Sequence, residues 1–414
     1  MNEWTTSPLE DLATFQKGRK VEVINQARNG FLPYLGAGVI SGRANSEFAS
    51  IIGAVLASEN DLLMLWDGER SGLVGTGKRG VVSSTVAKLT PKPKIDGRFL
   101  CYALFRYFDW IQARRTGTGV PHVPKDLAKI LQVDHPADKS EQLRIANVLD
   151  TIDEAISTTE AVIAKLKQVR AGMLHDMLSY GLDEHGQLRD PITHPEQFKD
   201  SPIGRIPKEW IFGPLSRFVP KAEYGISSCL GENGVPVLRM NNISGGEAQL
   251  SDLKYSSAHI PDRLWLRPGD VLFNRTNSWE HVGRTGIWRG QIERTTFASY
   301  LVRLNNNPDL LNSELLNLWL NWPMIQIAVR RFATPAVQQV NINPTNLRQV
   351  QAAFPKNINE QNEIVVRIGQ QDSAIRSLLA ENIKLKSIKF GFQDDLLTAR
   401  VRVPETVSFQ ESKL

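Results

Sequence analysis

Cysteine and long apolar runs are scarce in this chain. Its 414 residues include two cysteines, Cys101 and Cys229, which lie far apart in the sequence. Two cysteines exclude a disulfide framework and favour a reducing compartment. The longest apolar runs, such as residues 51–57, are far shorter than the ~20 residues of a membrane-spanning helix. The first residues have neither the basic stretch nor the apolar core of a signal peptide. We therefore expect a soluble, cytoplasmic protein without a membrane partner.

Motifs for metal binding and methyl transfer are also absent from the sequence. The seven histidines show no metal-ligand spacing, and two cysteines alone cannot hold zinc. A methyltransferase needs a glycine loop for its cofactor and an Asn/Asp-Pro-Pro-aromatic loop for adenine, but Asn343-Pro344 continues with Thr345. We therefore predict no catalytic residue, no metal site and no cofactor on this chain.

One glycine-rich loop comes close to a nucleotide-binding motif. Residues 72–79 nearly match GxxxxGK[ST], but Arg79 stands where the hydroxyl that binds magnesium belongs. The residues from Val81 onward alternate like a strand, whereas a phosphate-binding loop needs a helix there. A nucleotide-dependent enzyme is therefore a third hypothesis. We expect instead that Lys78 and Arg79 neutralise phosphate groups of DNA, since glycine lets the main chain approach the backbone.

A stretch of about 39 residues, Glu141–Ser179, organises the chain. It has no proline, and its seam positions recur in steps that alternate between four and three, with Thr159 and Arg170 at the two positions that are not apolar. The spacing predicts a long helix with a narrow apolar seam, like one strand of a coiled coil. Such a helix would span roughly 58 Å. The seam residues are Ile145, Leu149, Ile152, Ile156, Ile163, Leu166, Met173 and Met177.

The same stretch occurs a second time, 219 residues later and without a gap. Polar residues recur as well as apolar ones: Glu141-Gln142 becomes Glu360-Gln361, Asp153 becomes Asp372, and Asp176 becomes Asp395. Two unrelated helices would share a period but not these identities, so we infer an internal duplication. The segments before the helices repeat more weakly, since Glu3-Trp4 is echoed by Glu209-Trp210.

The duplication divides the chain into four segments. Residues 1–139 and 206–355 are predicted to be mixed α/β domains whose contents have diverged. Residues 140–205 hold the first long helix and a linker, and residues 356–414 hold the second helix and a tail. The net charge is +4 over residues 1–139 and +5 over residues 205–355, but −5 over residues 140–204. The basic excess therefore lies in the two domains, where it is a weak signal for nucleic-acid binding.

The order and duplication of these motifs resemble the specificity subunit of type I restriction-modification systems. The resemblance covers nearly the whole chain. It rests on the helix starts, the helix ends, the restart after the linker, and the run at residues 269–273. These motifs are Glu141, Gln142 and Ile145 with Glu360, Gln361 and Ile364; Gly172, Asp176 and Leu178 with Gly391, Asp395 and Leu397; and Ile206-Pro207-Lys208-Glu209-Trp210.

The resemblance implies an architecture and a set of partners. Two target recognition domains would be joined by two long antiparallel helices with pseudo-twofold organisation. Each domain would read one half of a bipartite sequence in double-stranded DNA. The helices would hold two methyltransferase subunits that modify adenine at N6, and restriction subunits would join them. S-adenosylmethionine, ATP and Mg²⁺ would then sit on the partner subunits, and this chain would be non-catalytic.

Polar residues in the loops of the two domains are the candidates for DNA contact. Arginine can fork onto guanine, and asparagine or glutamine onto adenine. Most such residues contact water or phosphate, which carries no sequence information. The candidates are Tyr34, Arg70, Lys78, Arg79, Ser84 and His122 in the first domain, and Arg239, Asn241, Asn274, Arg275, Asn277, Arg284, Tyr300, Gln338 and Gln339 in the second.

The helix residues are candidates for pairing and for partner contact. Both copies lie on one chain, so pairing within the chain is favoured over a homodimer. Acidic residues on the first helix, such as Asp153 and Glu160, face either a partner subunit or solvent. The alternative function is a coiled-coil scaffold that organises proteins without reading DNA. The pairing candidates are Glu141, Gln142, Ile145, Leu149, Ile152, Ile156, Leu166, Glu360, Gln361, Ile364, Ile375 and Leu385.

Overall fold

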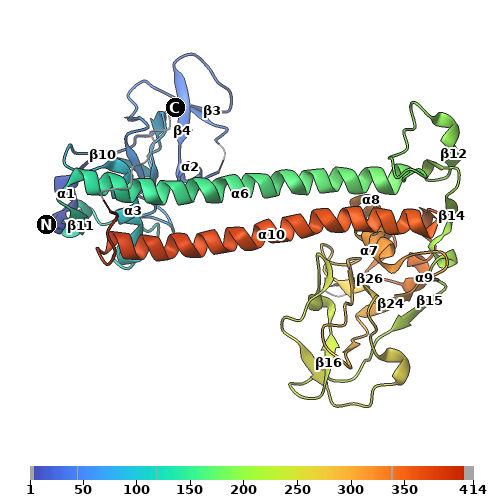
Figure 1. Cartoon of the computed structure of the whole chain (residues 1–414). Helices are drawn as coiled ribbons and strands as arrows, with labels where there is room; N and C mark the ends of the chain where they lie inside the picture. Colours follow the sequence, from blue (N-terminus) through green and yellow to red (C-terminus); the bar gives the residue numbers. More distant parts are fainter. Residues whose placement is uncertain (1–3, 44, 118, 337–338, 405–414) are drawn as a thin grey trace. The chain divides into compact units, whose positions relative to one another are not determined.

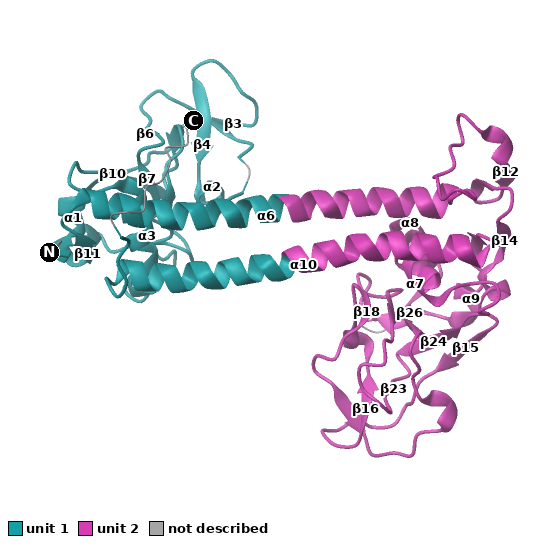
Figure 2. Ribbon diagram, in the orientation of Figure 1, with its two compact units in different colours: residues 1–161, 379–414 teal, residues 162–378 magenta. Residues whose placement is uncertain are grey.

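The computed structural model describes residues 4–43, 45–117, 119–336 and 339–404. The chain divides into two compact units (Figure 2). Unit 1 comprises residues 1–161 and 379–414, and unit 2 comprises residues 162–378. The division cuts both long helices, so each unit contains one half of each. No helix among the described residues is long and apolar enough to cross a membrane.

The two predicted long helices are confirmed. Helix α6 extends over Lys139–Tyr180 and helix α10 over Ile358–Leu397 (Figure 1). The halves of the two helices run antiparallel in each unit. In unit 1, Lys389 Nζ lies 2.5 Å from Asp153 Oδ1, and Lys386 Nζ lies 2.7 Å from Glu160 Oε1. In unit 2, Arg170 Nε lies 2.5 Å from Asp372 Oδ1.

The predicted seam of α6 faces inward along the helix. Ile145, Leu149, Ile156, Ile163 and Met177 are buried, whereas Ile152, Leu166 and Met173 are half-buried. Between Ile145 and Ile163, the other positions are exposed or half-buried, apart from buried Ala146. Near the start of α6 the seam packs against the unit 1 domain, since Ile145 and Leu149 belong to the core of that domain. The seam of α10 is more polar, since Asn382 is 8% exposed and donates to Glu160 Oε1 over 3.3 Å. The seam of the paired helices is therefore partly apolar and partly a ladder of polar contacts.

Unit 1 is a mixed α/β domain around two sheets. One sheet has four strands in the order β2-β10-β7-β8, and the other has five in the order β3-β5-β4-β9-β6. Helix α3 packs on the first sheet, and its residues from Phe99 to Leu104 are all buried in the core of this domain. Strands β1 and β11 pair antiparallel and lead into α6.

The remaining elements of unit 1 are short. Its strands are β1 (Trp4–Pro8), β2 (Ala13–Lys17), β3 (Val23–Ile24), β4 (Phe31–Leu35), β5 (Phe48–Ser50), β6 (Leu56–Ala57), β7 (Leu62–Leu65), β8 (Val74–Thr76), β9 (Gly80–Val82), β10 (Val86–Pro91) and β11 (Gln132–Pro136). Its helices are α1 (Leu9–Leu12), α2 (Ala37–Ile40), α3 (Gly97–Arg106), α4 (Phe108–Gln112) and α5 (Leu127–Ile130).

Unit 2 repeats this plan with a larger sheet. Six strands follow the order β15-β24-β20-β22-β18-β17, and two three-stranded sheets follow β19-β16-β23 and β21-β26-β25. Strands β14 and β27 pair antiparallel and lead into α10, as β1 and β11 lead into α6. The core contains Ile364 and Ile368 of α10 together with Leu174 of α6. The mixed α/β fold with paired long helices agrees with the prediction, whereas the predicted domain boundaries stay a prediction.

The strands of unit 2 are β12 (Phe198–Ser201), β13 (Gly204–Pro207), β14 (Ile211–Pro214), β15 (Lys221–Tyr224), β16 (Val235–Leu238), β17 (Ile243–Ser244), β18 (Gly246–Ala248), β19 (Lys254–Ser256), β20 (Val271–Asn274), β21 (Thr276–Asn277), β22 (Thr285–Ile287), β23 (Thr296–Phe297), β24 (Leu301–Asn305), β25 (Ala333–Ala336), β26 (Gln339–Ile342) and β27 (Gln351–Phe354). Its short helices are α7 (Ser313–Asn321), α8 (Pro323–Arg330) and α9 (Pro344–Leu347), with 3-10 turns η1 (Pro195–Gln197), η2 (Leu215–Arg217), η3 (Met240–Asn242) and η4 (Asp262–Leu264).

Candidate nucleic-acid interface

A hollow of about 410 Å³ on unit 2 brings three predicted residues together. Asn241, Asn277 and Arg284 come from separate segments of the chain, and all three line this hollow. Between them they offer two amides and one guanidinium, the groups that fork onto adenine and guanine edges. His281 lies at the same place and was not predicted; its ring Nδ1 is 2.9 Å from Ser278 Oγ.

Asn274 lies beneath this hollow and holds its walls in place. The residue ends strand β20 and is fully buried. Its side-chain amide donates to the Met240 carbonyl oxygen over 3.1 Å. Its backbone N–H donates to the Arg284 carbonyl oxygen over 2.8 Å, and its own carbonyl oxygen accepts from Gly283. Burial argues for a supporting role of Asn274 and against direct contact with a base.

A second group of predicted residues surrounds Arg275. Its guanidinium lies over the Tyr224 ring, 5.1 Å from the centroid, and donates to Asn341 Oδ1 over 2.8 Å. Its backbone N–H donates to the carbonyl oxygen of Tyr300, whose side chain is 46% exposed. Strand β21 pairs with β26, which begins at Gln339. Tyr224 and Asn341 were not predicted as site residues, because the local sequence around them contains no motif.

Two further candidates of unit 2 stand apart. Arg239 Nη2 lies 2.7 Å from Asp252 Oδ2, so its charge is already paired within the unit. Gln338 lies outside the described residues. For these two residues and for the two groups above, contact with DNA stays a prediction.

The candidates of unit 1 form two groups and an exposed loop. His122 Nδ1 lies 2.7 Å from Asp67 Oδ1, and Lys17 Nζ lies 2.9 Å from Asp67 Oδ2. Tyr34 donates its hydroxyl to Ser83 Oγ over 2.9 Å, next to half-buried Ser84.

Arg70 donates to Ser41 Oγ over 3.1 Å. Lys78 and Arg79 are exposed in the loop that joins β8 to β9. Lys17 was not predicted, because a single lysine at the end of a strand carries no motif.

The glycine-rich loop has a structural explanation. A Cβ atom at Gly77 would lie 2.2 Å from the Asp61 carbonyl oxygen, and one at Gly80 would lie 2.4 Å from the Pro33 carbonyl oxygen. These glycines therefore allow two backbone segments to approach closely. Strand β9 follows the loop in place of the helix that a phosphate-binding loop requires. The loop geometry therefore does not support the nucleotide-dependent hypothesis.

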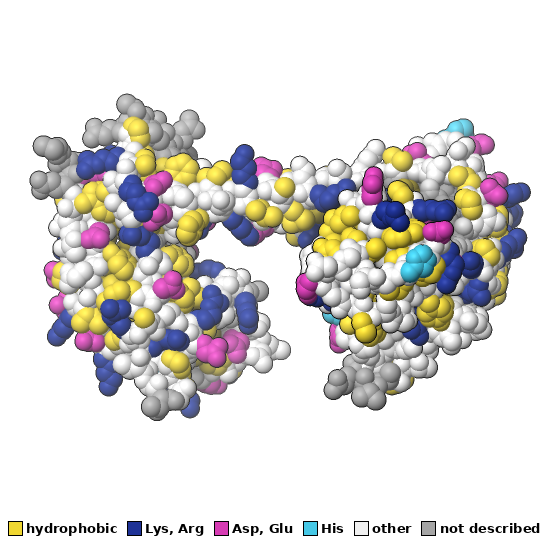
Figure 3. Space-filling model, turned by 90° about the horizontal axis from the view of Figure 1, so that it is seen from below, with side chains coloured by type: hydrophobic (Ala, Val, Ile, Leu, Met, Phe, Trp, Pro, Cys, Tyr) yellow, Lys and Arg dark blue, Asp and Glu magenta, His cyan; other side chains and the backbone are white. Residues whose placement is uncertain are grey.

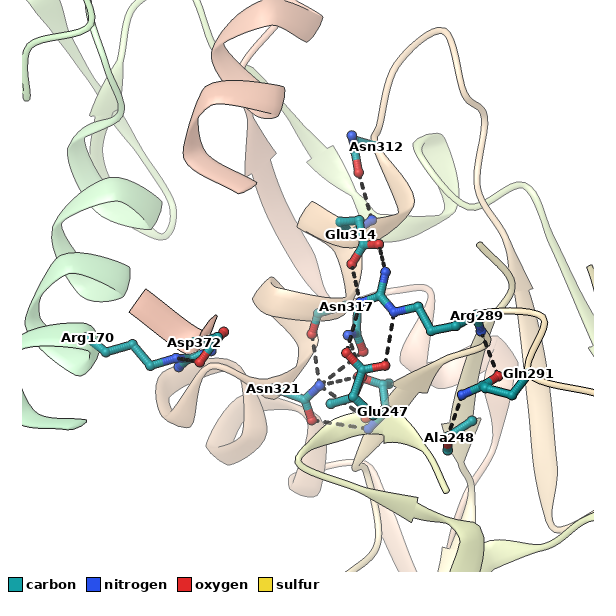
Figure 4. A network of polar contacts seen from close by, with 12 residues as sticks. Arg170, Glu247, Ala248, Arg289, Gln291, Asn312, Glu314, Asn317, Asn321 and Asp372 are labelled. Atoms are coloured by element: carbon teal, nitrogen blue, oxygen red, sulfur yellow. Dashed lines mark hydrogen bonds and ion pairs between the residues drawn. The ribbon is translucent and has the colours of Figure 1, made fainter. Parts of the chain in front are cut away.

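A larger groove of about 1010 Å³ lies between α6, α10 and α7 within unit 2. Arg289 forms ion pairs with Glu247 and Glu314 on one side of it, and Arg170 pairs with Asp372 on the other (Figure 4). The hydrogen bond to Glu247, with help from Glu314, raises the pKa of Arg289. Lys167, Arg284, Arg330 and Arg376 also line the groove. It is thus a polar, cation-rich groove next to the hollow, with which it shares Arg284.

On the face shown in Figure 3, basic side chains are spread over both units. In Figure 3, Lys and Arg side chains recur over the visible face of each unit, with acidic and apolar side chains between them. This distribution agrees with the modest positive charge of the two domains. A surface of this kind attracts a polyanion but needs specific groups to select a sequence.

Gln142 and Gln361 anchor each domain to its helix and do not pair the helices. Gln142 accepts the Asp96 N–H over 2.8 Å and donates to the Pro136 and Lys94 carbonyl oxygens. Gln361 accepts the Asn312 N–H over 2.8 Å and donates in the same way to Pro355 and Leu310. Both side chains are fully buried. The glutamine of the repeated Glu-Gln motif therefore anchors the start of each long helix to its own domain.

Glu360, in the first turn of α10, binds the linker that leaves α6. Its Oε1 accepts hydrogen bonds from Leu182 N at 2.9 Å, Arg189 Nη1 at 2.7 Å and Trp210 Nε1 at 3.1 Å. Gly181 has a φ of +65°, and a Cβ there would lie 2.3 Å from Glu360 Oε1. Only glycine therefore fits at the point where the linker leaves α6. We call this arrangement the Glu360 socket.

Known proteins are similar to this chain in sequence and in fold. Residues 1–168 match a family model described as the type I restriction modification DNA specificity domain. The type I restriction enzyme MjaVIII specificity subunit of Methanocaldococcus jannaschii is 27% identical over 97% of this chain and 93% of its own length. The chain is therefore similar over nearly its whole length to a type I specificity subunit. The EcoKI specificity subunit of Escherichia coli K12 is 22% identical over 89% of this chain and 82% of its own length.

The architecture of specificity subunits is shared as well. The crystal structure of the type I restriction-modification S subunit from M. genitalium superposes with a TM-score of 0.61 at 17% identity. The superposition covers 95% of this chain and 96% of that one. Both long helices and both mixed domains therefore fall within the shared fold. The family resemblance inferred from the repeated motifs is confirmed.

Proposed function

We propose that this chain is the DNA-reading subunit of a type I restriction-modification complex. Each mixed domain would read one half of a bipartite target in double-stranded DNA, and the paired helices would set the spacing and hold partner subunits. The observation that carries the proposal is the convergence of Asn241, Asn277 and Arg284 on one hollow in a chain similar to a specificity subunit. A good bidentate pair of this kind discriminates against a wrong base by ~1–3 kcal/mol.

The two domains would contribute unlike contacts to the same task. The unit 2 hollow offers amides and a guanidinium suited to base edges, whereas Lys78 and Arg79 of unit 1 are exposed cations suited to phosphate. Phosphate contacts supply affinity that falls with salt, and base contacts supply selection. The diverged contents of the two domains fit an asymmetric target.

Partner subunits would dock on exposed apolar residues of the helices. On the unit 1 half of α10, Ile383 is 71% exposed and Phe390 is 77% exposed, one heptad apart on the same face. Apolar residues that stay this exposed mark a surface for a protein partner. The partners would be two methyltransferase subunits, with restriction subunits possible beyond them. Asp153 and Glu160 are less suited to this role, because both already pair with lysines of α10.

The chain would be non-catalytic and would work where the DNA is, in the cytoplasm. S-adenosylmethionine, ATP and Mg²⁺ would be bound by the partner subunits. The scaffold alternative shares the helix pair and differs in the domains: it predicts no sequence-dependent DNA binding. Binding to duplex DNA that is absent, or insensitive to salt, would favour the scaffold.

The decisive experiment is a map of modified adenines after co-expression of this chain with a methyltransferase subunit of a type I system. We expect one bipartite motif with a fixed spacer. Exchange of residues 206–355 for the equivalent domain of a relative should change one half of the motif and leave the other. A change in both halves, or in neither, would contradict the assignment of one half-site to each domain. The double variant Ile383→Glu, Phe390→Glu should abolish copurification of the methyltransferase, and Lys384→Glu, next to Ile383 and also exposed, serves as the control.

A further inference from the structure

Helices α3 and α7 occupy equivalent places in the two units. Asp96 caps α3 and Asn312 caps α7, each through its side chain. The backbone N–H of each cap also donates over 2.8 Å to a repeated glutamine, Gln142 in unit 1 and Gln361 in unit 2. These shared contacts align α3 with α7 residue by residue, as the internal repeat aligns α6 with α10.

In unit 1 a charged network fills the space between α3 and the long helices. The Tyr102 hydroxyl lies 2.8 Å from Asp150 Oδ1 and 2.8 Å from Asp153 Oδ2, and Tyr102 is buried. Arg98 Nη1 lies 2.8 Å from Asp150 Oδ2. Lys389 pairs with Asp153, and its Nζ lies 5.7 Å from the centroid of the Tyr102 ring. Each carboxylate is thus matched by a cation around one buried tyrosine.

The equivalent place in unit 2 is the open groove of about 1010 Å³. Leu318 corresponds to Tyr102, and Gly369 corresponds to Asp150. A Cβ atom at Gly369 would meet nothing within 4 Å. The unit 2 counterparts of all five network residues line the groove: Glu314, Leu318, Gly369, Asp372 and Arg170. The groove is therefore the place of the unit 1 network with two smaller side chains.

The same comparison explains why cations of the groove lack partners. Lys167 corresponds to Lys386, which pairs with Glu160 in unit 1. Arg376 corresponds to Ser157. Both Lys167 and Arg376 are exposed, and neither forms an ion pair within the part of the chain that the structure describes. The lining as a whole holds six Lys and Arg side chains against four Asp and Glu side chains, so the groove attracts anions.

Phosphate of DNA is the anion that the position of the groove favours. Arg284 lines both the groove and the hollow, so the two form one continuous surface. Duplex DNA carries one charge per ~1.7 Å of its axis, so a duplex with bases at the hollow brings several phosphates alongside it. A guanidinium binds phosphate through two parallel N–H groups, and a lysine binds it as a point charge.

We propose that the groove of unit 2 binds backbone phosphates of the duplex that the hollow reads, with Lys167 of α6 and Arg376 of α10 as phosphate ligands. Resting on the proposed function, this assignment makes the unit 2 halves of the long helices part of the DNA-binding surface as well as a spacer. In unit 1, Tyr102 and two carboxylates occupy the equivalent place. The two halves of the target are therefore held by unlike backbone contacts.

A salt series on the full chain tests the phosphate contacts. Lys167→Ala and Arg376→Ala should each weaken binding to target and scrambled duplexes alike, by several-fold, and reduce the slope of log K against log salt by about 1. Lys165→Ala is the matched control, because Lys165 is an exposed cation of the same helix that does not line the groove. Slopes no lower than that of Lys165→Ala would overturn the proposal.

Returning the unit 1 carboxylate to the groove tests the role of charge. Gly369→Asp places a negative charge at the position that Asp150 holds in unit 1, and Gly369→Asn adds the same bulk without the charge. We expect Gly369→Asp to weaken duplex binding and reduce the salt slope, and Gly369→Asn to weaken binding far less. Equal losses in the two variants, or no loss in either, would contradict phosphate binding in the groove.

Selectivity separates this inference from the proposed function. Equal affinity of the chain for target and scrambled duplexes would contradict the proposed function, while the salt slopes still test the groove. Selective binding with unchanged slopes would contradict the groove alone. If Lys167→Ala and Arg376→Ala reduce copurification of the methyltransferase without changing DNA binding, a protein partner occupies the groove and the phosphate assignment is wrong.

Discussion

Arg189 and Glu360 form an almost fully buried ion pair, with Nη1 2.7 Å from Oε1 and side chains that are 9% and 7% exposed. The pair joins the linker to the first turn of α10. Removal of one partner leaves a buried charge uncompensated, which costs about 3–5 kcal/mol. We therefore expect Arg189→Met to lower the free energy of unfolding by this amount in urea titrations. Arg205→Met, at an exposed position of the same linker, is the control and should stay within ~0.5 kcal/mol.

The glutamine anchors should be nearly as sensitive. Gln361→Leu leaves the Asn312 N–H and two carbonyl oxygens without their partner, and each buried unsatisfied group costs about 1–3 kcal/mol. We expect a loss of at least about 2 kcal/mol by chemical denaturation, and the same for Gln142→Leu. Gln168→Leu, on the exposed face of α6, should change stability little. Equal effects of all three variants would contradict the anchor.

Acid should destabilise the chain partly through Glu223. Burial raises the pKa of this carboxyl, but hydrogen bonds from Arg303, Asn305 and Lys221 outweigh burial and lower it to about 2, from 4.5. Its contribution is present above pH 4.5 and is lost as the pH falls toward 2. The shift corresponds to roughly 3 kcal/mol. In Glu223→Gln, the slope of stability against pH across this window should be shallower. An unchanged slope would show that other carboxylates dominate.

The hollow of unit 2 should control base selection. Arg284→Ala should weaken binding to the cognate duplex by about 1–3 kcal/mol and relax selection at one position of the target. Competition titrations against duplexes that differ at single positions would measure both effects. Arg294→Ala, also in unit 2, removes the same charge but not a group of the hollow. A uniform loss on every duplex would assign Arg284 to phosphate contact.

The glycine-rich loop of unit 1 should act through charge alone. Lys78→Ala should weaken binding to all duplexes alike and reduce the slope of log K against log salt by about 1. The measurement is a salt series with cognate and scrambled DNA. Loss of ATP binding in this variant would revive the nucleotide hypothesis. We expect no ATP binding to lose, because strand β9 follows the loop.

The helical frame was predictable because its signal is local and repeated. A period that alternates between three and four determines which residues face inward, and Leu149, Ile156 and Ile163 are buried as predicted. The duplication favoured pairing of the two helices within one chain, and the family resemblance implied that they run antiparallel. Scarce cysteine and short apolar runs needed no structure to exclude a disulfide scaffold or a membrane span.

The roles of single residues were harder to predict. Asn274 looked like a contact residue because it is polar and follows a strand, yet it is fully buried and bonds to Met240. Tyr224 reaches Arg275 from a strand some fifty residues away, which no spacing rule encodes. Of the loop candidates, only those that share a concave surface in the folded unit gain support.

The sequence alone determined the two long helices, their duplication and the resemblance to specificity subunits. Periodicity and repeated polar identities can be recognised without knowing which residues are in contact. The tertiary structure decided what the repeated residues do. Gln142 and Gln361 hold backbones, Glu360 receives an arginine from the linker, and Glu141 does not receive one from the described residues. The reason is physical: a hydrogen bond depends on where a distant segment returns, and identical motifs differ in what the rest of the chain brings to them.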